Sequence, residues 1–191
     1  MSSKSALRSE LFLKGAPTYL DALAALEAFQ QEVEAMCTKV YSRHKDRLLP
    51  AMGLDGDDDF ERYVDGEPAE RWSQVGISRG YQKRGLDGPC FRLYVSFSES
   101  EDGTMAVEAT VWLECSKTRR PRDDIYDRIR RKNLHCRLVK DDDDESTYFG
   151  LYFATPVKPD ELSSVPDALS NVLLELIGYC ESVEGLNLKA L

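Results

Sequence analysis

The chain has 191 residues, of which 42% are hydrophobic and 31% charged, a balance typical of a folded domain with a buried core. Its formal net charge is −9, which disfavours a general nucleic-acid binder, because an acidic protein repels phosphate backbones at long range. No apolar run approaches the roughly 18 residues that span a bilayer. The first residues, MSSKSALRSELFLKG, lack the apolar core of a secretory signal. We therefore expect a cytoplasmic protein without membrane contact.

The five cysteines are scattered, and none belongs to a C-x-x-C pair. This spacing does not predict a zinc site, and the odd number argues against a disulfide framework. Because cysteine is among the residue types most often buried, we expect reduced thiols that pack as small apolar side chains.

A long helix is predicted over residues 18–47, where apolar residues recur at spacings of three and four. Pro17 and Thr18 mark its expected start, and Pro50 its end. Residues 1–16 are expected to precede it as a flexible N-terminal segment. We expect the apolar stripe of the helix to pack on a sheet, with a partner-binding seam as the alternative. The stripe consists of Leu20, Leu23, Leu26, Phe29, Val33, Met36, Val40 and Tyr41.

Residues 53–72 are rich in glycine and aspartate, and we interpret them as an acidic loop. Three aspartates in this stretch fit positions 1, 3 and 5 of a calcium-binding EF-hand loop. That loop also requires a glycine at position 6 and a bidentate glutamate at position 12. The sequence has Phe60 and Gly66 there, so an EF-hand is not predicted.

Five strands are predicted from alternating or short apolar runs bounded by turn residues. They cover residues 75–81, 91–97, 107–117, 133–139 and 147–154. A short helix is expected around Asp123–Arg131, between the third and fourth strands. The last helix is predicted at residues 160–183, where Pro166 suits the first turn of a second helical segment that follows a separate turn.

This order predicts the α+β class. Tight turns between strands favour a mostly antiparallel five-stranded sheet, with the long N- and C-terminal helices packed on it. We find no internal repeat and no second core, so a single α+β domain is predicted over residues 1–191. Whether the second face of the sheet is exposed stays open.

The end of the third strand raises the question of nuclease activity. Nucleases of the PD-(D/E)xK superfamily place an acid, one spacer and a lysine at the end of a strand, so that both side chains face one metal and one phosphate. This chain has two spacers between Glu114 and Lys117, which puts the two side chains on opposite faces. The order of helices and strands loosely resembles that superfamily, but the motif does not match, and an active nuclease is not predicted.

Other catalytic patterns are also missing from the sequence. His44 is expected to be exposed near the end of the first helix. His135 precedes Cys136 directly on a strand, so their side chains point to opposite faces and do not pair as base and nucleophile. The chain has no phosphate-binding P-loop and no nucleophile elbow. We predict no catalytic residue, no metal ligand and no cofactor, and we lean against an enzyme.

The leading functional hypothesis concerns the side of the third strand that faces away from the core, together with an acidic turn. Aromatic side chains between carboxylates are typical of protein interfaces. The predicted partner-binding residues are Tyr94, Glu108, Trp112, Glu114, Asp141, Asp142, Asp143 and Asp144. We expect a non-catalytic interaction module, of the type of an acidic inhibitor or immunity protein that masks a basic protein target.

The alternative hypothesis concerns residues 117–132, which hold eight basic and three acidic residues in an otherwise acidic chain. The arginines of this patch are Arg119, Arg120, Arg122, Arg128, Arg130 and Arg131. They favour a nucleic-acid-associated protein with a degenerate nuclease-like fold, whose affinity would fall steeply with salt. A third possibility, an enzyme for a small ligand, would require a pocket with perturbed titratable groups.

Overall fold

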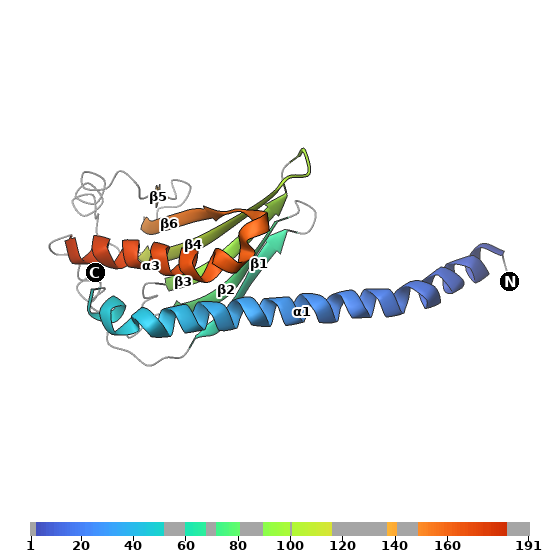
Figure 1. Cartoon of the computed structure of the whole chain (residues 1–191). Helices are drawn as coiled ribbons and strands as arrows, with labels where there is room; N and C mark the ends of the chain where they lie inside the picture. Colours follow the sequence, from blue (N-terminus) through green and yellow to red (C-terminus); the bar gives the residue numbers. More distant parts are fainter. Residues whose placement is uncertain are drawn as a thin grey trace.

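The computed structural model describes residues 3–51, 60–67, 72–80, 90–99, 101–115, 137–140 and 149–182. These ranges form one antiparallel sheet and two long helices, and both helices lie on the same face of the sheet (Figure 1). The predicted α+β class, with N- and C-terminal helices on an antiparallel sheet, is confirmed. None of the described helices is long and apolar enough to cross a membrane.

The sheet has six strands in the order β1-β2-β3-β4-β6-β5, and every neighbouring pair is antiparallel. The strands are β1 (Glu61–Glu67), β2 (Trp72–Gly80), β3 (Cys90–Glu99), β4 (Met105–Cys115), β5 (Arg137–Lys140) and β6 (Phe149–Val157). Strands β2 to β6 correspond to the five predicted strands. The helix expected around Asp123–Arg131 lies outside the described residues.

Strand β1 corrects the prediction of an acidic loop over residues 53–72. Its short alternation is interrupted by Gly66 and carries acidic residues, which are depleted in strands. The strand forms because its whole length pairs with β2, from Glu61 opposite Ser78 to Glu67 opposite Trp72. This pairing partner is a tertiary feature that local sequence does not reveal.

Helix α1 spans Ser3–Ala51 and contains both Pro17 and Pro50. The start predicted at Pro17 is therefore wrong, although the end near Pro50 is confirmed. A proline inside a helix removes one hydrogen bond and clashes with the carbonyl four residues earlier. The segment before Pro17 holds three leucines, two alanines and two lysines, which are among the best helix formers.

At the C-terminal end, a 3-10 helix η2 (Pro159–Ser164) precedes helix α3 (Val165–Ser182). Pro166 lies in the first turn of α3, as its fixed φ favours, so the predicted second helical segment is confirmed. Residues of α3 spaced by three and four are buried, which orients one face of this helix toward the sheet.

The core lies between the sheet and the two helices. Strand β4 contributes the alternate residues Val107, Ala109, Val111 and Leu113, all buried, and their register partners on β3 and β6 continue the same apolar face. The C-terminal half of α1 adds Val33, Cys37, Val40, Tyr41 and Leu48. The alternation predicted for the third strand therefore identified the core face correctly.

Candidate interaction surfaces

The face of the sheet opposite to α1 and α3, called the outer face below, carries a row of aromatic side chains. They come from β1, β3, β4 and β6, at positions whose parity is opposite to that of the core residues. The rings belong to Tyr63, Tyr94, Trp112 and Tyr152. Two of these, Tyr94 and Trp112, belong to the predicted partner-binding set, and the structure places both on the predicted side of the sheet.

Tyr94 is the most deeply buried member of this row, with 5% of its surface exposed. Its ring lies 5.5 Å from the ring of Tyr63, and it stands opposite Gly76 in the register of β2 and β3. A Cβ atom added at Gly76 would lie 2.6 Å from the Cα of Tyr94, so this close approach requires glycine. Burial raises the pKa of Tyr94 above its ordinary value. Tyr94 therefore packs within the sheet surface, and its predicted role as an exposed contact residue is not compatible with this burial.

Tyr63 links the edge strand to the centre of the outer face. Its hydroxyl donates a hydrogen bond to Oε1 of Gln74 at 2.7 Å. The guanidinium carbon of Arg92 lies 5.1 Å from the centre of the Tyr63 ring, a cation–π distance. These contacts fix the ring of Tyr63, which is half-buried.

Trp112 and Tyr152 form the second aromatic pair, with ring centroids 5.8 Å apart in an edge-to-face arrangement. Both side chains are half-buried. The indole nitrogen of Trp112 and the hydroxyl of Thr110 are shielded from solvent and have no hydrogen-bond partner in the described part of the chain. The accessible part of Trp112 is therefore its ring carbon surface, which suits apolar contact.

Carboxylates surround this aromatic row. Glu108 is half-buried, and its charge contributes to the raised pKa of Tyr94, which indicates proximity. Glu61 and Asp65 on β1 are exposed. The backbone of Glu114 belongs to β4, but its side chain and residues 141–144 lie outside the described residues. Of the predicted set, the structure thus brings together Tyr94, Glu108 and Trp112.

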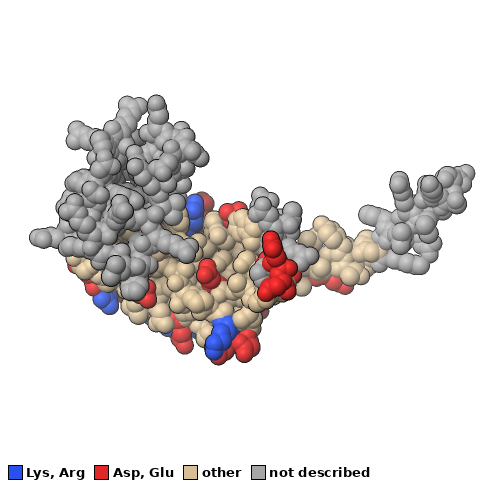
Figure 2. Space-filling model, turned by 90° about the horizontal axis from the view of Figure 1, so that it is seen from above, with Lys and Arg blue, Asp and Glu red and all other residues tan. Residues whose placement is uncertain are grey.

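More acidic side chains lie at the turn between β3 and β4. Glu99, Glu101 and Asp102 are exposed there. Figure 2 shows acidic side chains gathered on the surface of the molecule. The turn depends on Gly103, whose φ of 81° favours glycine. The amide of Thr104 donates a hydrogen bond to Oδ1 of Asp102 at 3.0 Å. The residues predicted as an arginine patch, 117–132, lie outside the described residues, so that hypothesis stays a prediction.

The side chains of His44, Cys37 and Cys180 are partly or fully covered by the fold. His44 is half-buried, and its Nε2 lies 2.6 Å from Oγ of Ser170 on α3, which corrects the predicted exposure. Desolvation, and then the charges of Arg43 and Arg47, lower the pKa of His44. Cys37 and Cys180 are buried thiols, as expected. Within the described ranges, no group of three or more His, Cys, Asp or Glu residues could hold a metal ion.

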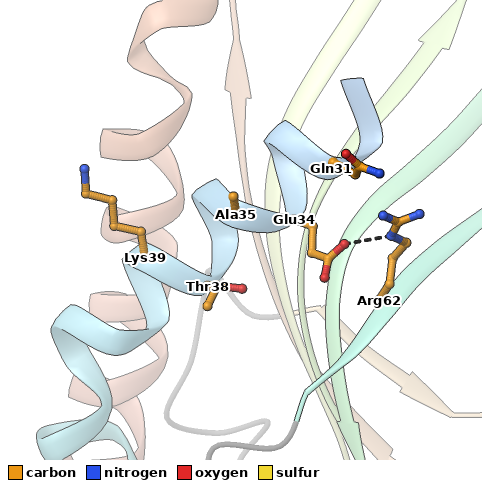
Figure 3. A pocket seen from close by; sticks show the side chains of 6 residues that line it. All are labelled: Gln31, Glu34, Ala35, Thr38, Lys39 and Arg62. Atoms are coloured by element: carbon orange, nitrogen blue, oxygen red, sulfur yellow. Dashed lines mark hydrogen bonds and ion pairs between the residues drawn. The ribbon is translucent and has the colours of Figure 1, made fainter. Parts of the chain in front are cut away.

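A shallow, open hollow of about 500 Å³ lies between α1 and the edge strand β1 (Figure 3). It is lined by Gln31, Glu34, Ala35, Thr38, Lys39 and Arg62. Nε of Arg62 donates a hydrogen bond to Oε2 of Glu34 at 2.7 Å, which ties β1 to the helix. The hollow contains a partly exposed ion pair, of a kind that contributes little to stability. The sequence did not indicate it, because β1 itself was not predicted.

The apolar stripe of α1, which was predicted to pack on the sheet, is buried in one part of the helix and exposed in the other. From Val33 onward it is part of the core, whereas residues 15–29, called the α1 arm below, extend past the sheet (Figure 1). Five large hydrophobic side chains of the arm are exposed: Tyr19 (64%), Leu20 (62%), Leu23 (43%), Leu26 (50%) and Phe29 (39%). Phe29 marks the boundary, because its ring contacts that of Phe97 on β3 at 5.2 Å.

Comparison with protein-family models, with curated proteins and with solved structures finds no match to this chain.

Proposed function

We propose that this protein is a non-catalytic interaction module that binds a basic protein through the outer face of its sheet. The observation that carries the proposal is the edge-to-face pair of Trp112 and Tyr152, half-buried on the outer face of the sheet, with Glu108 further along the same face of β4. Large aromatic side chains with apolar surface in contact with solvent are typical of the residues that contribute most to binding energy in protein interfaces.

The charge of the surrounding surface selects the partner. Glu61, Asp65 and the turn acids are exposed, and the whole chain has a net charge of −9. Such a surface accelerates encounter with a basic protein and disfavours an acidic one. This combination of an aromatic anchor and an acidic surface would suit an inhibitor or immunity-type protein that masks a basic target.

The test is an affinity capture with the immobilised full chain in extract of the native cell, at low and at moderate salt, with and without nuclease. The decisive variant is Trp112→Ala combined with Tyr152→Ala, which removes both rings. The matched control is Leu174→Ala, which removes an exposed apolar side chain of α3 on the other side of the sheet. Circular dichroism spectra of both variants establish that they fold.

We expect one stoichiometric basic protein that survives nuclease treatment, with affinity reduced by at least about tenfold in the aromatic double variant and unchanged in the control. Titration of the captured protein's own activity with this chain then tests inhibition. Capture that is indifferent to the two rings would contradict the proposed surface. Recovery of nucleic acid that is lost at moderate salt would instead support the arginine-patch alternative.

A further inference from the structure

The α1 arm is an exposed apolar surface that the proposed function does not use. Tyr19, Leu23 and Leu26 are spaced by four and three, and this spacing continues through Gln30, Val33 and Cys37. It is the period of helices that pair along a seam. Since Val33 and Cys37 are buried in the core, the exposed residues continue a face that packs wherever the structure offers it a partner.

The arm also contains residues that weaken a helix. Gly15 and Pro17 lie in the interior of α1, where they disfavour helix relative to alanine by about 1 and about 3 kcal/mol. Tyr19 and Leu20 leave well over half of their surface exposed within the described chain. Most helical stability in proteins comes from packing of an apolar face. The described part of one copy of the chain therefore does not cover the apolar face of the arm.

The charges along α1 indicate which kind of partner would pack on the arm. Residues 3–14 hold three basic residues and one acidic residue, whereas residues 21–32 hold three acids and no lysine or arginine. Two copies of this helix repel each other in parallel orientation, because like segments meet. In antiparallel orientation, the basic segment of each copy meets the acidic segment of the other. In a two-fold symmetric pair, this contact between opposite charges forms at both ends of the paired helices.

We propose that the α1 arm is a dimerisation element in which two copies of this chain pair antiparallel, with Tyr19, Leu23 and Leu26 in the seam. The arm projects from the sheet (Figure 1), so the two sheets lie at opposite ends of the paired helices. Each dimer then presents two outer faces. This assignment is independent of the proposed function, since it uses a different surface.

The seam is tested by sedimentation velocity of the full chain over a range of concentrations. The wild-type protein is expected to sediment as a dimer. Leu23→Glu combined with Leu26→Glu is expected to weaken dimerisation by more than about 100-fold, because two leucines lose their apolar contacts and two charges enter the seam. The control is Leu174→Glu, which places a charge at an exposed leucine of α3 and leaves the dimer intact. Equal thermal unfolding of dilute variants shows that the fold is unaffected.

The orientation is tested by Glu27→Lys combined with Glu32→Lys, two exposed positions. In an antiparallel pair these changes place lysines against the basic segment, so dimerisation weakens by about tenfold or more. In a parallel pair they relieve repulsion between like acids, so dimerisation strengthens. A strengthened dimer would overturn the antiparallel assignment.

Three results would overturn the dimer itself. These are a wild-type chain that stays monomeric at the highest soluble concentration, a dimer that persists in the seam variant, and a monomer whose seam residues bind a different protein. None of these results bears on the affinity capture through Trp112 and Tyr152. The two proposals therefore fail separately.

Discussion

The two halves of α1 have the same period and similar apolar residues, but different surroundings. Between Val33 and Leu48 the stripe lies under the sheet and beside α3, and its members are nearly inaccessible to solvent. Between Tyr19 and Phe29 the same kind of stripe is exposed. Periodicity thus predicts that a helix has an apolar face, but which part of that face is covered depends on where the sheet ends.

The largest expected effect is a difference in the free energy of unfolding between variants in the two halves of α1. Leu48 is fully buried and Leu26 is half-exposed. Leu48→Ala is expected to destabilise the fold by about 2–5 kcal/mol, because it leaves a cavity. Leu26→Ala is expected to change the stability of the dilute monomer by less than about 0.5 kcal/mol. Urea denaturation at low protein concentration measures both, and similar losses for the two variants would show that the arm packs within a single chain.

The fold class could be predicted because strand alternation and helix period are local properties. The alternation of apolar residues from Val107 to Leu113 indicates the core face from the sequence alone. The same face is buried in the structure. Strand β1 could not be predicted, because Glu61 to Glu67 becomes a strand through its ladder with β2. Pro17 does not mark the start of α1, because the residues on both sides of it continue the helix.

The sequence predicts which face of the sheet carries the candidate site. It does not predict how deeply the side chains of the site are buried. Parity alone places Tyr94 and Trp112 on the outer face. The burial of Tyr94 depends on its register neighbours, Gly76 on one side and Thr110 on the other, and these pairings join distant parts of the chain. The position at which α1 passes the end of the sheet, marked by Phe29 and Phe97, is likewise a tertiary property.

A thiol probe sharpens the comparison of the two halves. Burial in the C-terminal half raises the pKa of Cys37 to about 12, and the neighbouring charge of Glu34 adds to this effect. An ordinary thiol has a pKa of about 8.5, and the thiolate is the reactive form. At pH 8, Cys37 is therefore expected to react with an alkylating reagent more than about 1,000-fold more slowly than a cysteine placed on the arm by Leu26→Cys, with the protein kept dilute. Mass spectrometry of the two peptides gives the rates, and rapid labelling of Cys37 would show that this half of α1 opens readily.

The smallest expected effect concerns pH and the contact of α1 with α3. The pKa of His44 is lowered in the folded protein, first by desolvation and then by Arg43 and Arg47. Below the unfolded pKa of about 6.5, the unfolded chain binds a proton that folded His44 does not yet bind, so stability falls as the pH decreases through this range. His44→Gln retains a side chain that can hydrogen-bond to Ser170, and is expected to flatten the dependence of the urea midpoint on pH between 7.5 and 5.5. An unchanged slope would mean that other groups carry the pH dependence, whereas a flattened slope would locate it at the point where the packed half of α1 meets α3.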